Sequence, residues 1–528
     1  MAGSVWEFCA AITEQKVDGR KFGEALQVDG LPLWYFLDPF YLPKPFKSWS
    51  KVDKIVAKEV RPSRAEGLKI SMLSPALRTW LAFNERRKIR GPKKKAGKIK
   101  PKKKDVLFLT HSNQVFEKGG KFSFLGLDDV LRDLEKRGVE PLVVVCDLLS
   151  NPFYKYRRYP NAPDYLVSMY EYVDREILKD SKSLSKKLNR EWKRIDKPSL
   201  FSFKGRDYWA AMKGGVNFVL SREMLSMTLA YYMTFKKIIQ AHDVKVVYLT
   251  GIGMHELPLL AAARNLGKRA VYSAHGYGLA MEDIGTMMSS GKYRDVVFFA
   301  AGEEQRRKLY SGVKSGNVVI TGSPFFDKVA GYRSRKVEHG GKKVVVHLSS
   351  ALVEYGLIGK DDYFKYIRNF LSQVSRVKEV GKVVIRPHPL EKHIPEYKAA
   401  IKSLGLKNVE IAQRPDKEAL YSVLSKSDLV VSTISTADIE ALMLDKDVIL
   451  VDGLRKSSRA EQAEAEYQKV VLEVDKDGDL AGIITKVLTD RKMQKELEQR
   501  RRKYVEDSFY RIDGKAHERV ADSIKSLI

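Results

Sequence analysis

Residues 428–452 read DLVVSTISTADIEALMLDKDVILVD. The stretch holds an apolar run, a turn rich in hydroxyl residues, a segment with helical spacing and a second apolar run. Continuous Val, Ile and Leu runs that alternate with helices are typical of a parallel sheet covered on both faces. The stretch therefore predicts one strand–helix–strand unit of a doubly wound α/β domain.

The same alternation extends in both directions and falls into two series. The first series has apolar runs such as DVLFLT at 105–110 and VKVVYLT at 244–250, and the second begins near Asn317 with NVVITG. Two such domains in tandem place a cleft between the carboxyl ends of their sheets, where folds of this class bind ligands. We expect Rossmann-like domains at residues 105–315 and 316–505, and a closing helix at 506–528.

The chain of 528 residues begins differently. Residues 1–85 form an appendage that is locally dense in aromatic residues and proline, and residues 86–104 hold twelve Lys or Arg and no acidic residue. Gly and Pro within this basic run indicate an extended, self-repelling linker. The formal charge of the chain is +29, so the linker supplies a large part of the excess.

A basic segment can bind an anionic membrane or nucleic acid, or can remain a solvated tether. Proteins that bind single strands interleave basic and aromatic side chains, but the run at 86–104 contains no aromatic residue. Nucleic acid is therefore the weakest interpretation. The sequence has no apolar run of membrane-spanning length and no signal peptide, and its two cysteines cannot form a disulfide framework. We expect a cytoplasmic protein whose linker is either a solvated tether or a peripheral contact with the inner membrane face.

GxGxxG, GxxxxGK[ST] and GxSxG are all missing, which argues against nicotinamide dehydrogenases, P-loop kinases and serine hydrolases. The main site candidates are instead polar residues at the predicted strand ends of the second domain. Arg386 and His388, in IRPHP at 385–389, offer a fixed cation and an imidazole that suit phosphate oxygens. Two prolines in the same segment fit a rigid turn with no ligand equally well.

The turn inside the opening stretch is the second candidate. It contains four hydroxyl residues ahead of a helix, and a helix start offers unpaired amides to phosphate; these residues are Ser432, Thr433, Ser435 and Thr436. Glu440 lies one turn into the helix and can reach ribose hydroxyls. The alternative is an ordinary N-cap followed by a solvent-facing acid. Further polar loops add Ser349 and Ser350 in HLSSA, and Gly322 and Ser323 in TGSPFFD.

Several of these segments resemble the GT-B fold glycosyltransferases of surface polysaccharide assembly, in their capsule, sialyl- and Kdo-transferase and CDP-glycerol glycerophosphotransferase branches. The matching segments are VVFFAAGEEQRRKL (296–309), NVVITGSPFFDKV (317–329), VVIRPHP (383–389), SDLVVSTISTADIEALMLDKDVILVD (427–452) and KAHERVADSI (515–524). In YSAHG (272–276), His275 and Gly276 match the pair that closes the N-terminal domain of that family. The likeness in architecture covers about 105–528.

This resemblance implies roles for the candidates of the second domain. His388 would contact the donor phosphate, the 432–436 turn would hold the nucleotide phosphates, and Glu440 would bind the ribose. Ser349 and Ser350 would line the same site.

The first domain should supply a general base for the acceptor hydroxyl. Glu256, in GMHELP, and His111, after DVLFLT, both follow predicted strands, although each also fits an ordinary loop or first-turn residue. Asp128 and Asp129 start a predicted helix and are better explained as first-turn acids. The predicted catalytic residues are Glu256, His111 and His388.

Metal ligands are not evident from residue spacing. No DxD follows a predicted strand of the cleft and no HExxH occurs, and DKDGD at 475–479 continues with Leu480 and Lys486 where a calcium loop needs its glycine and its glutamate. We expect no metal and no cofactor besides the nucleotide-sugar substrate.

Three classes of function follow. The leading hypothesis is an inverting, metal-independent glycosyltransferase that moves a sugar from a nucleotide donor to a glycan or lipid-linked acceptor; a CDP-glycerol-type polyol-phosphate transferase is a close variant. A nucleotide-sugar epimerase of the same architecture is the second class. A nucleic-acid-binding protein is a distant third.

Overall fold

The computed structural model describes nine stretches of the chain and a few isolated positions. They are residues 15–36, 102–118, 121–146, 162–273, 295–310, 315–333, 341–412, 417–454 and 465–528, together with 293 and without 18, 204–205, 208, 210–212, 214–215, 218, 252, 355–356 and 434. The basic run at 86–101 and the predicted pair His275 and Gly276 lie outside the described residues.

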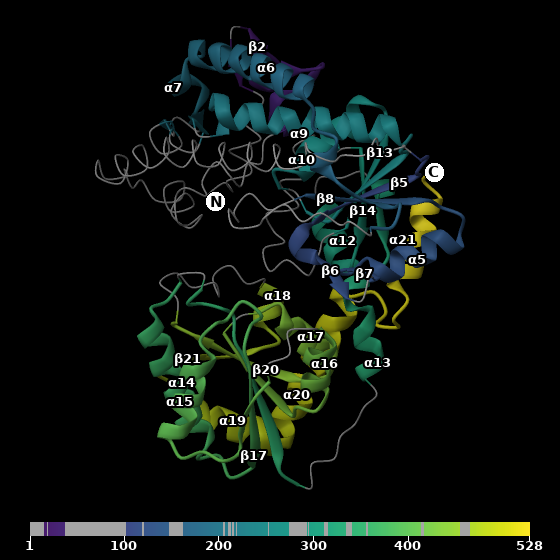
Figure 1. The fold of residues 1–528 in the computed structure, drawn as a ribbon. Helices are drawn as coiled ribbons and strands as arrows, with labels where there is room; N and C mark the ends of the chain where they lie inside the picture. Colours follow the sequence, from purple (N-terminus) through teal and green to yellow (C-terminus); the bar gives the residue numbers. More distant parts are fainter. Residues whose placement is uncertain are drawn as a thin grey trace.

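The first domain, in the upper half of Figure 1, is built on a parallel sheet. Its strand order is β15-β14-β13-β12-β5-β8-β9. Its strands are β5 (Val106–His111), β8 (Pro141–Cys146), β9 (Leu166–Ser168), β12 (Val246–Leu249), β13 (Arg269–Tyr272), β14 (Val296–Ala300) and β15 (Val318–Ile320). The chain moves outward from β5 to β9 and then returns to the other side of β5 at β12. The boundary between β5 and β12 is therefore the topological switch point, where doubly wound sheets bind ligands.

Both faces of this sheet are buried, as its continuous apolar strands predict. Leu107 and Leu109 of β5 pack into one hydrophobic cluster, and Val106 and Phe108 pack into the cluster on the opposite face. The first cluster includes side chains of α6 (Arg175–Arg194), α9 (Arg222–Ala241) and α10 (Glu256–Asn265). The second includes side chains of α5 (Asp128–Lys136) and α21 (Ala516–Lys525).

The second domain repeats this plan with the strand order β18-β17-β16-β19-β20-β21. Its strands are β16 (Lys343–Leu348), β17 (Val380–Arg386), β18 (Val409–Ile411), β19 (Leu429–Ser432), β20 (Asp447–Asp452) and β21 (Leu472–Asp475), all parallel. Its switch point lies between β16 and β19. The predicted strand–helix–strand unit is present as β19, α17 (Ala437–Met443) and β20.

Helices cover both faces of the second sheet as well. One apolar cluster includes side chains of α16 (Lys417–Ser425), α17 and α20 (Arg491–Ser508). The other includes side chains of α14 (Lys360–Val374), α15 (Ile394–Ser403) and α19 (Leu480–Thr489). The predicted fold class, two Rossmann-like domains in tandem, is confirmed.

Short elements connect and flank the two domains. They are β1 (Lys16–Val17), β2 (Arg20–Lys21), α2 (Phe22–Ala25), β3 (Gln27–Val28), β4 (Leu31–Pro32), η1 (Leu33–Phe36), η4 (Ser112–Gln114), β6 (Val115–Lys118), β7 (Lys121–Phe124), η5 (Met169–Glu171), α7 (Lys197–Leu200), β10 (Ser202–Phe203), β11 (Arg206–Asp207), α12 (Glu303–Tyr310), η6 (Ser315–Asn317), η7 (Pro324–Val329), α13 (Ala330–Arg333) and α18 (Ala465–Gln468). None of the helices within the described stretches combines the length and apolarity needed to cross a membrane.

The described part of the appendage, residues 15–36, packs onto the first domain. The ring of Phe36 meets that of Tyr232 on α9 edge-on, with centroids 4.9 Å apart. Asp29 accepts hydrogen bonds from the Tyr232 hydroxyl and from Lys236 Nζ, each at 2.7 Å. The guanidinium of Arg264 on α10 lies over the Tyr35 ring, 4.7 Å from its centroid.

One segment lies elsewhere than the sequence places it, and the closing helix finds its packing partner. Val318–Ile320, expected at the start of the second domain, forms β15 and pairs with β14 in the first sheet. The closing helix α21 returns to the first domain and packs beside α5 (Figure 1). The apolar composition of a segment predicts that it joins a parallel sheet. It does not predict which sheet, because the two sheets offer the segment equivalent apolar edges.

Candidate functional site

The switch point of the second sheet brings together two of the predicted hydroxyl loops. Ser350 follows β16 and Thr433 follows β19, and the Thr433 hydroxyl donates to Ser350 Oγ across the switch point at 3.0 Å. Both side chains are buried. Ser349, the residue before Ser350, accepts a hydrogen bond from the backbone N–H of His388 at 3.0 Å. The predicted loops after β16, β17 and β19 therefore meet at one edge of the sheet.

A carboxylate outside the predicted set fixes this arrangement. Glu391 accepts hydrogen bonds from the Ser349 hydroxyl, from the Ala351 N–H at 3.1 Å and from the Tyr397 hydroxyl at 2.9 Å. Burial raises the pKa of Glu391, although these donors oppose the shift. Sequence reasoning missed this residue because a glutamate after a proline-rich loop resembles any surface acid.

Arg386 and His388 lie at the end of β17, as predicted. Arg386 is buried and donates from one guanidinium nitrogen to the Ala412 carbonyl at 3.1 Å, so part of its hydrogen-bonding capacity stabilises the sheet edge. His388 is half-buried, and its Nδ1 accepts from the Leu390 N–H at 3.2 Å. Burial lowers the pKa of His388, and Arg386 lowers it further, while Glu354 opposes the shift. The imidazole is therefore neutral near pH 7, with Nε2 as its donor.

The 432–436 turn divides into two parts. Ser435 caps α17: its hydroxyl accepts from the Ala437 N–H at 3.2 Å, and its own N–H donates to Asp438 Oδ2 at 2.8 Å. Thr436 is exposed beside it. The capping interpretation therefore accounts for Ser435. Ser432 is fully buried, and its hydroxyl has no hydrogen-bond partner among the residues that the structure describes.

Glu440 lies on the buried side of α17 rather than in solvent. Its Oε1 accepts a hydrogen bond from the Tyr421 hydroxyl of α16 at 3.1 Å, and its side chain is 3 % exposed. This contact ties α17 to α16. The predicted contact with a ribose stays a prediction.

Gly322 and Ser323 follow β15 and lie at the junction with the C-terminal segment. Gly322 has φ +78°, and a Cβ there would lie 3.1 Å from both Ala516 and the Arg519 guanidinium. Its neighbour Thr321 accepts from Arg519 Nε at 2.7 Å. These contacts explain the glycine by close packing against α21.

The first domain brings its two candidates together at its own switch point. His111 ends β5, Glu256 starts α10 after β12, and His111 Nε2 lies 3.1 Å from Glu256 Oε1. The other carboxylate oxygen of Glu256, Oε2, accepts a hydrogen bond from the Gly253 N–H at 3.0 Å. A Cβ at Gly253 would lie 2.8 Å from that oxygen, so the glycine lets the carboxylate fold back over the loop.

Electrostatics favour the charged form of this pair. Burial alone lowers the pKa of His111, but the neighbouring Cys146 and Glu256 outweigh it and raise the pKa to about 11. Burial raises the pKa of Glu256, but the hydrogen bond and charge of His111 reverse this and lower it to about 2. The pair is therefore imidazolium and carboxylate near pH 7.

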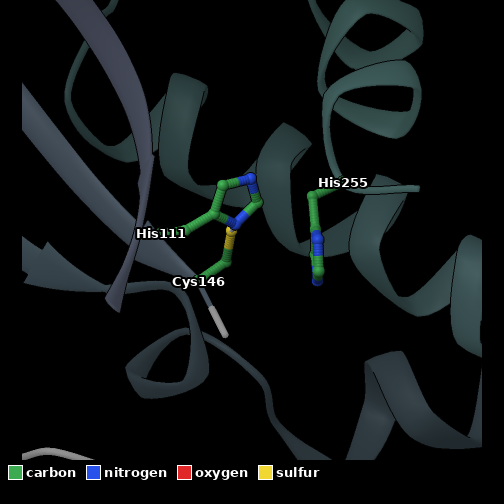
Figure 2. A group of neighbouring side chains, drawn as sticks. All are labelled: His111, Cys146 and His255. Carbon is green, nitrogen blue, oxygen red and sulfur yellow. Dashed lines mark hydrogen bonds between the residues drawn. The ribbon is translucent and has the colours of Figure 1, made fainter. Parts of the chain in front are cut away.

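Two further residues complete this cluster, and sequence reasoning did not find them. Cys146 ends β8, and its Sγ lies 3.3 Å from His111 Nδ1. His255 immediately precedes Glu256, and its ring centroid lies 5.8 Å from that of His111 (Figure 2). Both side chains are buried. Neighbouring parallel strands place residues far apart in sequence at one edge, so spacing alone cannot reveal the set.

Comparisons with known proteins find structural likeness only. No family model matches the sequence, and no curated protein matches it. A candidate UDP-N-acetylglucosamine 2-epimerase of Listeria monocytogenes has 14% identity and a TM-score of 0.48, over 80% of this chain and 96% of that one. The S. aureus MnaA–UDP structure has 17% identity and a TM-score of 0.46, over 80% and 98%.

The wall teichoic acid polymerase TagF has 10% identity and a TM-score of 0.42, over 88% of this chain and 98% of that one. Likenesses this distant describe the shape of the chain and assign no activity. The order of strands and the residues at the two switch points therefore carry the functional inference.

Proposed function

We propose that this protein is an enzyme that acts on a nucleotide-activated sugar, and that it transfers the sugar to a glycan or lipid-linked acceptor. The observation that carries the proposal is the contact between Ser350 and Thr433 across the switch point of the second sheet. Ligands of doubly wound domains bind at this place. The hydroxyls of Ser350 and Thr433 meet there, the backbone N–H of His388 donates to the adjacent Ser349, and a diphosphate needs several such donors.

The donor would lie against the second domain. Arg386, His388, the serines after β16 and the 432–436 turn would stabilise the charge that grows on the leaving phosphate, without a metal at the phosphates. The buried hydroxyl of Ser432 is an additional donor at the same strand end. Glu440 would bind the ribose after its hydrogen bond with the Tyr421 hydroxyl breaks.

The acceptor would lie against the first domain. His111 and Glu256 are the acid–base candidates, and they stand at the corresponding switch point of the first sheet. The same pair also favours the second candidate function, an epimerase, because an epimerase must move a proton on the sugar itself.

The nucleotide is identified by thermal shift of the full chain against CMP-, CDP-, UDP- and GDP-sugars and CDP-glycerol. One nucleotide class should raise the unfolding midpoint, and His388→Ala should weaken its binding about tenfold, a typical loss for one charge-assisted contact. The matched control is His393→Ala, whose ring lies between Glu354 and Glu396. Equal binding by both variants would place the donor elsewhere.

The reaction class is decided with that nucleotide sugar. Incubation without acceptor should leave it unchanged, and addition of a lipid-linked glycan fraction should release the nucleotide. Conversion to an isomer in the absence of acceptor would establish the epimerase and reject the transferase.

The basic run at 86–104 supports a peripheral position at an anionic membrane, since each basic residue near such a surface contributes about 1 kcal/mol. The chain should sediment with vesicles of anionic phospholipid at low salt and not with neutral vesicles. Replacing Lys93, Lys94 and Lys95 by Gln should weaken this binding. Binding that does not change with salt or with these substitutions would contradict the proposal.

A further inference from the structure

The switch point of the first sheet holds three side chains of the kinds that bind transition metals. His111, Cys146 and His255 each offer one ligand atom, and these atoms all lie within 4.8 Å of one another. Figure 2 shows the His111 imidazole above the Cys146 sulfur, with the His255 ring facing both. Cys146 and His255 are 1 % and 3 % exposed, so the ligand atoms are shielded from bulk water.

The distances fit a tetrahedral ion. Zinc bonds of about 2.0 Å to nitrogen and 2.3 Å to sulfur place neighbouring ligand atoms about 3.5 Å apart. His111 Nδ1 and Cys146 Sγ already lie 3.3 Å apart. The remaining pairs lie within 4.8 Å, and the His255 ring must turn to point a nitrogen at the ion.

The surroundings of His111 provide an independent second observation. A histidine that binds metal through one ring nitrogen almost always hydrogen-bonds a carboxylate or carbonyl through the other. His111 turns Nδ1 to the cysteine and Nε2 to Glu256, at 3.1 Å. Glu256 is held in turn by the Gly253 N–H. The ring of Tyr231 packs against that of His255, with centroids 4.6 Å apart.

We propose that His111, Cys146 and His255 bind one zinc ion, with Glu256 orienting His111 from the second coordination shell. Two histidines and one thiolate supply three ligands, the number found in catalytic zinc sites, and a water molecule would take the fourth position. The ion would stand in the first domain, away from the donor phosphates. Binding it replaces the acid–base role proposed above for His111, whereas nucleotide binding by the second domain does not depend on it. The zinc site replaces the expectation of a metal-free protein, which rested on residue spacing.

The same side chains also form a Cys–His–Glu chain, the arrangement of a thiol nucleophile. Two observations favour the metal. The Cys146 side chain is nearly inaccessible, whereas a nucleophile must meet its substrate. His255 has no part in such a triad, yet it faces both of the other ligands.

Zinc and cobalt binding to the full chain test the proposal without any sugar nucleotide. The chain is stripped with chelator under a thiol reductant and then titrated with Zn²⁺ or Co²⁺. We expect one ion per chain, a rise in the thermal unfolding midpoint, and a cobalt spectrum with thiolate charge-transfer and intense tetrahedral bands.

Variants assign the ligands. Cys146→Ser should abolish the charge-transfer band and His255→Asn should weaken cobalt binding at least tenfold, while Glu256→Gln should weaken it about tenfold, as second-shell changes do. Cys9→Ser and His393→Gln are the matched controls and should bind like the unmodified chain. Circular dichroism without metal checks that each variant is folded.

Three results would overturn the proposal. They are the absence of stoichiometric binding by the unmodified chain, equal binding by Cys146→Ser, and rapid alkylation of Cys146 by iodoacetamide that excess Zn²⁺ does not slow. The last result would favour the nucleophile.

Discussion

His347 lies in the middle of the second sheet, fully buried, with Nε2 3.0 Å from the Tyr366 hydroxyl. Burial lowers the pKa of His347 to about 3, so the ring stays neutral in the folded protein. The unfolded chain binds a proton at this residue near pH 6.5, and the folded chain does not. The stability that depends on neutral His347 is therefore complete above pH 6.5 and is lost as the pH falls toward 3.

As the pH falls, the unfolding free energy of the unmodified chain should therefore decrease more steeply than that of the His347→Gln variant. Between pH 7.5 and 5.5 the unmodified chain should lose about 1.4 kcal/mol more unfolding free energy than the variant, since a shift of one pKa unit corresponds to that amount. Urea unfolding at the two pH values measures the difference. His393→Gln, at a partly exposed position, should keep the steep loss. Equal slopes for His347→Gln and the unmodified chain would show that His347 titrates normally.

At the scale of elements, the loops after β16 and β17 depend on Glu391. This carboxylate joins the Ser349 hydroxyl, the Ala351 N–H and the Tyr397 hydroxyl, so it sets where the hydroxyls of the switch point stand. Glu391→Ala should weaken nucleotide-sugar binding about 10- to 100-fold, because hydrogen bonds to a charged group contribute about 1.5–3 kcal/mol. Calorimetric titration measures the loss. Glu410→Ala, on an exposed edge strand, should bind normally.

A second element-scale prediction concerns the approach of α12 to the end of α20. A Cβ at Gly302 would overlap with the Ser508 carbonyl, and the Ser508 hydroxyl donates to Glu304 at 2.6 Å. Gly302→Ala should lower the unfolding free energy by about 2 kcal/mol, because backbone must move to admit the methyl group. At Gly316, a Cβ would have open space, so Gly316→Ala should be neutral. Chemical denaturation of both variants makes the comparison, and equal midpoints would contradict it.

The strand–helix alternation sufficed to predict the sheets, because residues such as Val430 and Val431 must be apolar when both faces are covered. The positions of the Ser350 and Thr433 hydroxyls were predictable as well, because both residues directly follow strands that the alternation places in the centre of the sheet. Glu391 and Cys146 were not predictable, because their roles depend on which side chains of other loops stand beside them. The capping role of Ser435 was one of two open interpretations, and its contacts with Ala437 and Asp438 distinguish them.

At the scale of the whole molecule, the C-terminal segment joins the two domains. After α20 the chain crosses to α21, where His517 lies between Asp327 at 2.7 Å and Asp133 of α5 at 3.3 Å. Asp327 also accepts from the Ala516 N–H at 2.9 Å. Arg137, the C-cap residue of α5, donates to Asp522 of α21 at 2.7 Å. The last residues of the chain thus cover one face of the first sheet, and the folding of this domain depends on contacts of very large sequence separation.

This arrangement predicts that the C-terminal helix stabilises the first domain rather than the second. Ile524 of α21 is 0 % exposed and packs in the same cluster as Val130 and Leu134 of α5, whereas Ile528 is 42 % exposed. Ile524→Ala should cost about 2–5 kcal/mol of unfolding free energy, the usual loss for a truncated core isoleucine, while Ile528→Ala should stay within about 0.5 kcal/mol. Hydrogen exchange followed by peptide mapping locates the loss: amides of β5 and β8 should exchange faster in Ile524→Ala, and those of β16 and β19 should not. Faster exchange confined to the second sheet would mean that α21 belongs to that domain in solution.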